Sequence, residues 1–112
     1  MPIFITQGRY SLDAIQGMTA NPEDRAEAAG RLFEAAGGKI LAYYVTLGEY
    51  DWLIVSEFPD HQAVSAAVLA AAGSGGVTDV RTTLAMTTAE AKGVFAATGK
   101  AAAAYRVPGG AT

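Results

Sequence analysis

Apolar residues gather in four short segments that have the length and composition of β-strands. These segments are rich in Ile, Val, Phe, Tyr and Thr, which favour extended backbone, and they span residues 2–10, 39–48, 51–58 and 77–86. Only Gly48-Glu49-Tyr50 connects the second segment to the third. So short a connection predicts an antiparallel hairpin.

Helical signals lie between the first two strands. Ser11 is a candidate N-cap for a short helix over residues 11–18. The main helix is predicted to start at Asn21-Pro22-Glu23-Asp24, which offers an N-cap, a proline at the first helical position and acids in the first turn. Apolar residues then recur at helical spacing, and Gly37-Gly38 is predicted to end the helix.

Two further helices are predicted in the second half of the chain. Asp60 is the candidate N-cap of one, and the glycines of residues 73–76 are predicted to end it. Thr87 and Glu90 have the spacing of a capping box for the other, which we expect Gly99 to end.

This order of elements is β-α-β-β-α-β followed by a C-terminal helix. It predicts an α+β, ferredoxin-like domain with a four-stranded antiparallel sheet and two helices on one face. We assign residues 1–99 to this domain and residues 100–112 to a flexible C-terminal tail.

Both faces of the predicted sheet carry apolar side chains. Strict alternation places Leu41, Tyr43 and Val45 on one face of the second strand and Ile40, Ala42 and Tyr44 on the other. An antiparallel sheet with one solvated face would alternate apolar and polar residues instead. Two helices cover one face only, so we expect the same sheet of a second subunit to cover the other. The predicted partner is a second copy, in a homodimer or a higher even oligomer.

Composition narrows the class of protein. The 112 residues are 51% apolar and 17% charged, and the mean hydropathy of +0.21 is high for a small domain. A net charge of −3 argues against a nucleic-acid partner. No apolar run is long enough to span a membrane, and no basic leader precedes an apolar core, so we expect a cytoplasmic protein without a membrane partner. With no cysteine and one histidine, we expect no metal and no cofactor.

The stretch Gly48-Glu49-Tyr50-Asp51 has two interpretations. Its residue types suit a tight turn, in which Asp51 accepts backbone hydrogen bonds. Alternatively, Tyr50 and Asp51 form an acid–base pair at a cavity mouth, with His61 as a further base at a helix N-terminus. We favour the turn and an exposed histidine, and keep Tyr50, Asp51 and His61 as candidate catalytic residues.

Four other residues are candidates for binding a small organic molecule. Tyr44 and Trp52 could line an aromatic pocket, although packing in the core or at a subunit interface is the favoured interpretation. Arg81 lies mid-strand, where a charge needs a partner or a polar cavity. Thr6 lies on the strand expected beside it, so we predict a polar lining near Thr6 and Arg81.

Residues 21–60 carry a resemblance to a known family. A Pro-x-x-Arg helix start, a Gly-Gly turn, Leu-Gly-x-Tyr-Asp before a strand and a Pro-Asp helix start resemble the GYD domain family. The segment GSGGVTDVRTTLAMT adds to the likeness, which spans about residues 3–98. The resemblance implies a dimeric α/β barrel of the ferredoxin-like superfamily. It supplies no established reaction.

Two functions are compatible with these patterns. The first is a homo-oligomeric protein that binds a small organic molecule between sheet and helices and acts as a metal-free acid–base enzyme, such as an isomerase, a cyclase or a cofactor-free oxygenase. The alternative is a non-catalytic module for ligand sensing or assembly. The fold alone does not choose between them.

Overall fold

The computed structural model describes residues 1–110, and it has the predicted order of elements. The strands are β1 (Ile3–Tyr10), β2 (Lys39–Val45), β3 (Trp52–Glu57) and β4 (Val77–Ala85). The helices are α1 (Leu12–Ala20), α2 (Ala26–Ala35), α3 (His61–Gly73) and α4 (Thr88–Ala103). The strands form one antiparallel sheet in the order β2-β3-β1-β4, so the predicted α+β, ferredoxin-like arrangement is confirmed.

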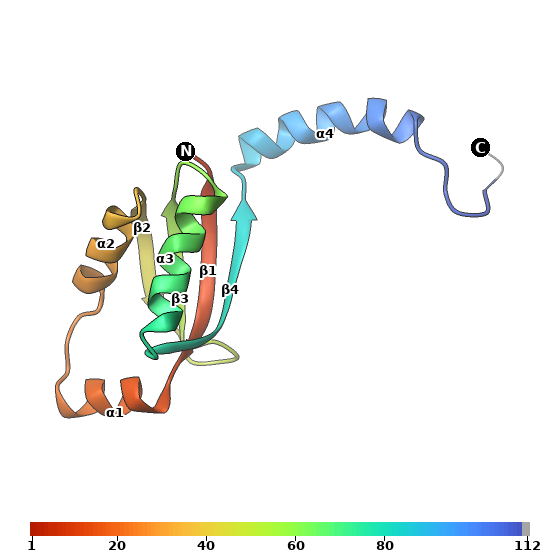
Figure 1. Cartoon of the computed structure of the whole chain (residues 1–112). Coiled ribbons are helices and arrows are strands. Elements are labelled where there is room, and N and C mark those ends of the chain that lie inside the picture. Colours follow the sequence, from red (N-terminus) through yellow and green to blue (C-terminus); the bar gives the residue numbers. More distant parts are fainter. Residues whose placement is uncertain (111–112) are drawn as a thin grey trace.

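Helices α2 and α3 pack on one face of the sheet, whereas α4 leads away from it (Figure 1). The core lies under α2 and α3. Phe58 is fully buried there, with ring centroids 6.3 Å from Phe4 and 5.3 Å from Phe33. We call this side of the sheet the helix-side face. The other side, which no helix covers within the part of the chain that the structure describes, is called the open face.

Most predicted caps are present. Ser11 accepts a hydrogen bond from the backbone of Ala14, and Asp60 accepts one from Ala63. Thr87 and Glu90 form the complete capping box of α4. Gly37 has a φ of 93°, the left-handed conformation expected just after a helix.

Helix α2 starts later than predicted, at Ala26 rather than near Asn21. The carboxylate of Asp24 accepts a hydrogen bond from the backbone N–H of Ala26 at 2.9 Å. This local bond stabilises a turn that competes with an earlier helical start. Arg25 therefore takes the N-cap position, and its side chain does not cap the helix.

Helix α4 runs past Gly99, which was predicted to end it, and continues to Ala103. Glycine costs about 1 kcal/mol in a helix relative to alanine, and the following Lys100 and three alanines are strong helix formers. The helix therefore crosses the predicted boundary between domain and tail. The assignment of residues 100–112 to a flexible tail stays a prediction, and residues 111–112 lie outside the described residues.

The faces of β2 also differ from strict alternation. Ile40 pairs with Ser56 and Ala42 pairs with Val55, so Leu41 is an extra residue in a β-bulge. The bulge resets the alternation by one position. As a result Ile40 packs against the core on the same side as Tyr43, and was wrongly grouped with Ala42 and Tyr44.

Candidate functional site

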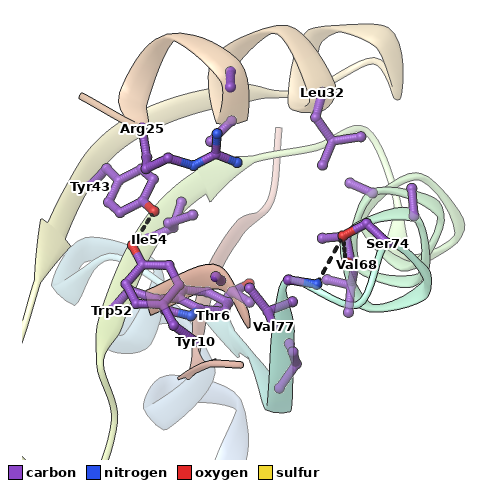
Figure 2. A pocket seen from close by; sticks show the side chains of 18 of the residues that line it. Thr6, Tyr10, Arg25, Leu32, Tyr43, Trp52, Ile54, Val68, Ser74 and Val77 are labelled. Carbon is purple, nitrogen blue, oxygen red and sulfur yellow. Dashed lines mark hydrogen bonds between the residues drawn. The ribbon is translucent and has the colours of Figure 1, made fainter. Parts of the chain in front are cut away.

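A cavity of about 540 Å³ lies between the helix-side face and the helices (Figure 2). Its walls are mainly apolar side chains from the sheet, α2 and α3, including Leu32, Phe33, Ile54, Val68 and Ala71. Alanines line much of the helical walls, so the helices leave space that larger side chains would fill. This volume is within the range typical of sites for small organic ligands.

Trp52 lines this cavity and is only 5% exposed. Its indole lies against Gly8 of the neighbouring strand, and a Cβ on Gly8 would come within 2.5 Å of Trp52 Cζ2. Glycine is therefore required at this position for the ring to lie flat on β1. The indole Nε1 is buried and has no hydrogen-bond partner among the described residues.

Two tyrosines form a hydroxyl pair in the cavity wall. The hydroxyl oxygens of Tyr10 and Tyr43 lie 2.8 Å apart, within hydrogen-bonding distance (Figure 2). Burial, and then the bond to Tyr10, raise the pKa of Tyr43 well above its ordinary value. Tyr43 is therefore a neutral hydrogen-bonding group at physiological pH.

The remaining polar side chains of the cavity are two hydroxyls, of Thr6 and Ser74, and a charged pair. Thr6 is 1% exposed, and its Oγ1 lies 3.2 Å from that of Thr82. Arg25 Nη1 donates to Glu23 Oε1 at 3.0 Å, and both of these charged side chains are about half exposed. Figure 2 shows the Arg25 side chain beside the Tyr43 ring on one side of the cavity.

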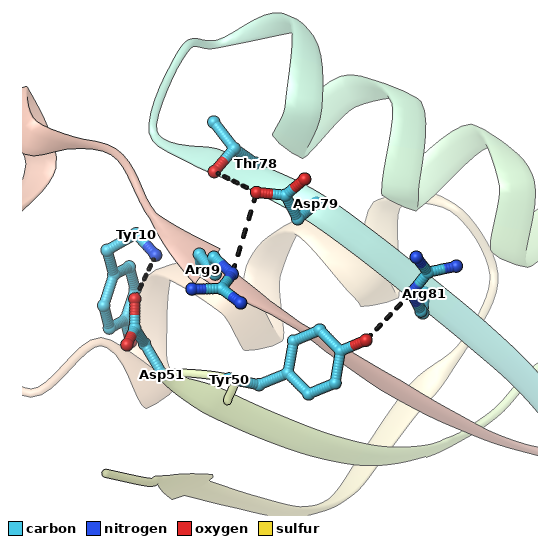
Figure 3. Close-up of polar contacts among 7 residues, drawn as sticks. All are labelled: Arg9, Tyr10, Tyr50, Asp51, Thr78, Asp79 and Arg81. Atoms are coloured by element: carbon cyan, nitrogen blue, oxygen red, sulfur yellow. Dashed lines mark hydrogen bonds and ion pairs between the residues drawn. The ribbon is translucent and has the colours of Figure 1, made fainter. Parts of the chain in front are cut away.

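The structure separates Tyr50 from Asp51. The hydroxyl of Tyr50 accepts a hydrogen bond from Arg81 Nε at 2.8 Å, and Arg9 lies 6.0 Å from the centre of its ring (Figure 3). Asp51 instead accepts a hydrogen bond from the backbone N–H of Tyr10 at 2.9 Å. The two side chains therefore do not form a pair, and neither lines the cavity.

His61 is the first residue of α3 and is exposed. The loop with Tyr50 and Asp51 precedes β3, whereas His61 follows it, so a strand of six residues separates them. That length is about 20 Å. The three candidate catalytic residues are thus not brought together, and their catalytic role stays a prediction without a common site.

The four candidate binding residues divide between the two faces. Thr6 and Trp52 line the cavity on the helix-side face. Thr6 pairs with Thr82, so the neighbouring Arg81 points to the open face, and the polar lining shared by Thr6 and Arg81 does not form. Tyr44 is 62% exposed and lies on the open face as well.

Sequence reasoning missed Tyr10, Tyr43 and Arg25 as cavity residues. Alternation had required that Tyr43 and Tyr44 face opposite sides, and the choice of Tyr44 was wrong for this cavity. Tyr43 pairs with the core residue Ile54, and this register, which places Tyr43 in the cavity wall, is not visible in the sequence.

Two features are absent from the part of the chain that the structure describes. Between residues 1 and 110, no group of three or more His, Cys, Asp or Glu could hold a metal ion. Over the same range, no helix is both long enough and apolar enough to cross a membrane.

Comparisons with known proteins agree with the fold. A Thermus thermophilus protein named glutamine synthetase and cystathionine beta-lyase binding protein is 34% identical over 77 residues, which are 69% of this chain and 81% of that protein. Among solved structures, TTHA0845 from Thermus thermophilus superposes with a TM-score of 0.51 at 19% identity, covering 78% of this chain and 95% of that one.

A further solved structure is the transcriptional regulator NMB0573 of Neisseria meningitidis in complex with L-Met. It superposes with a TM-score of 0.53 at 21% identity, covering 77% of this chain and half of that chain. At this identity the likeness concerns the fold alone. The family model of the GYD domain matches residues 4–95. The chain therefore belongs to the GYD domain family.

Proposed function

We propose that this chain is a non-catalytic module that binds a small organic molecule in its helix-side cavity and assembles with a second copy through its open face. The cavity between sheet and helices is the observation that carries the proposal. Its apolar walls and few converging polar groups are typical of a ligand site.

The chemistry of the cavity favours binding over catalysis. Tyr50, Asp51 and His61, the expected acid–base residues, do not line it. Of the two tyrosines that do, Tyr43 has a pKa raised further from neutrality, whereas an efficient general acid or base titrates near the working pH. Proton-transfer catalysis therefore has little support among the residues that meet a bound molecule.

The open face supports assembly. Its centre is formed by apolar side chains from the two middle strands, Ile3, Ile5, Leu53 and Val55. These side chains are only half-buried within a single chain. An apolar face of this kind in a small domain is typical of an interface, and a second copy of the same face is its simplest cover.

The relative from Thermus thermophilus supports a function that is exerted by binding other proteins. It is named as a binding protein of two enzymes, and this chain spans most of its length. We infer that the present chain acts likewise by contacting other proteins, with the bound small molecule as the signal.

Native mass spectrometry of the freshly purified protein tests this function. We expect a dimer or a higher even oligomer that carries an additional small mass, which denaturation releases. Ala71→Leu places extra atoms in the cavity, whereas Ala72→Leu makes the same change at an exposed position outside it. We expect Ala71→Leu to lose the additional mass and Ala72→Leu to retain it.

Two results would contradict the proposal. A stable monomer would remove the assembly part. An empty protein whose melting temperature responds to no member of a small-molecule library would remove the ligand part.

A further inference from the structure

The hydroxyl pair of Tyr10 and Tyr43 offers a hydrogen-bond donor to the cavity. In the Tyr10–Tyr43 pair, one hydroxyl hydrogen lies between the two oxygens, so the other is free to donate to a third atom. The indole Nε1 of Trp52 also lacks a partner within residues 1–110, but it is fully buried and adds no donor that a ligand in the cavity could reach. The free hydroxyl hydrogen of the tyrosine pair therefore favours a ligand that supplies an acceptor atom.

Arg25 adds a positive charge on the side of the cavity where Tyr43 lies (Figure 2). A guanidinium has five N–H donors, and the contact with Glu23 uses one nitrogen of Arg25. Exposed ion pairs contribute little to stability, so Glu23 competes only weakly with a second anion. Arginine also matches the planar geometry of a carboxylate, to which it can donate two parallel hydrogen bonds.

The apolar residues of the lining determine which kind of ligand body fits the cavity. Leu32, Phe33, Ile54 and Val68 surround the cavity with apolar atoms, and Trp52 provides a flat surface. Ionic or strongly polar groups placed against these walls would lose hydration without gaining partners. An aromatic or branched aliphatic body fits them.

We propose that the ligand is an organic acid with a compact apolar body, whose carboxylate binds Arg25 and the hydroxyl pair of Tyr10 and Tyr43. This inference rests on the proposed ligand-binding function and assigns the chemical class of the ligand. Glu23 also lines the mouth, where it would favour a cationic group. The free hydroxyl hydrogen of the tyrosine pair and the charge of Arg25 together favour the acid.

Isothermal titration calorimetry with matched acids and amides tests the assignment. The probes are benzoate, 3-phenylpropanoate, 4-methylpentanoate and octanoate, each compared with its primary amide and with the amine of the same body. We expect at least one acid to bind at least about tenfold more tightly than both neutral and cationic analogues, since hydrogen bonds between charged groups are about twice as strong as those between neutral groups.

The chain offers a close control for Arg25. Arg31 lies on α2, which Arg25 precedes as the N-cap, and it is likewise paired with a glutamate, Glu27, at 2.7 Å, but it does not line the cavity. Arg25→Gln is expected to reduce the affinity for the acid at least about tenfold, and Arg31→Gln is expected to leave it unchanged. Tyr43→Phe should weaken binding as well, whereas Tyr44→Phe, on the open face, should not.

The outcomes distinguish a failure of this inference from a failure of the proposed function on which it rests. Equal affinity for acid and amide, tighter binding of the amine, or an unchanged affinity in Arg25→Gln would overturn the acid assignment while a ligand-binding cavity remained. Failure of every acid to bind would overturn it too. If, in addition, no amide or amine binds and the purified protein carries no small mass, the proposed function fails with it.

Discussion

Tyr50 and Asp51 are consecutive in the chain, yet they hold two different strands. Tyr50 accepts a hydrogen bond from Arg81 on β4, and Asp51 accepts one from the backbone of Tyr10 at the end of β1. The backbone N–H of Asp51 also donates to Gly8 at 2.8 Å. Through these two hydrogen bonds Asp51 holds the β2–β3 loop against β1. Tyr50 lies on the open face, where it binds Arg81.

Substitution of Asp51 is expected to affect stability rather than ligand binding. Asp51→Ala removes the acceptor for the Tyr10 N–H, and we expect a loss of about 1–2 kcal/mol in the free energy of unfolding. Asp51→Asn retains an acceptor and should lose less. Urea denaturation measures this, with Glu49→Ala in the same loop as the control, because Glu49 is exposed. A folded Asp51→Asn variant of normal stability that no longer binds ligand would restore the catalytic or binding interpretation.

Because of Tyr43, we expect the free energy of unfolding to depend on pH in the alkaline range. Its pKa is raised in the folded protein, so above about pH 10 the unfolded chain releases the proton while the folded chain keeps it. The contribution is fully present below pH 10 and is lost as the pH rises toward the folded pKa. We expect the free energy of unfolding to fall less steeply between about pH 10 and pH 12 in Tyr43→Phe than in the unsubstituted protein. Tyr44→Phe should follow the unsubstituted protein, and a Tyr43→Phe profile with the same slope would contradict the shift.

Gly8→Ala tests the contact under Trp52. The added Cβ would meet the indole at 2.5 Å, and overpacking of this kind costs about 1–3 kcal/mol. Because the chain has one tryptophan, its fluorescence reports on the cavity directly. We expect Gly8→Ala to shift the emission and to lower stability, while Gly48→Ala, with no atom near the new Cβ, does neither. Unchanged emission in Gly8→Ala would show that the ring does not lie on Gly8.

Val55→Glu tests the open face. Val55 pairs with Ile5 near the middle of the sheet, so a charge there would be buried in a face-to-face dimer. Leaving a buried charge unpaired costs about 3–5 kcal/mol, so we expect the dimer dissociation constant to rise at least about 100-fold. Sedimentation velocity measures this. Leu12→Glu on α1, which is 69% exposed and outside the sheet, is the control. Equal dissociation constants in the two variants would place any interface elsewhere.

The sequence predicted the fold well because its local signals agree with one another. Asp60, Thr87 and Glu90 act through bonds within a few residues, so their roles can be deduced from spacing alone. The two wrong predictions also concern local structure, but of a kind that spacing does not indicate. The bulge at Leu41 and the late start of α2 depend on single local bonds or insertions that composition does not reveal.

The site was predicted less well because it depends on register. Thr6 and Trp52 were candidate binding residues and both line the cavity, but which of Tyr43 and Tyr44 joins them depends on pairing across β3. Tyr10 and Tyr43 are separated by 33 positions and meet only once the sheet has formed. No spacing rule connects them.

The extended position of α4 alters the dimensions of the chain. The radius of gyration is 18.3 Å, whereas a compact chain of this length would have about 13 Å. On α4, Phe95 is 75% exposed, so the helix has an apolar side chain without cover in a single chain. Small-angle X-ray scattering of the Val55→Glu variant, at concentrations where it is monomeric, would measure the radius of gyration and thus show whether α4 extends away from the domain. A radius of gyration near 18 Å corresponds to an extended α4, and one near 13 Å corresponds to α4 packed against its own domain.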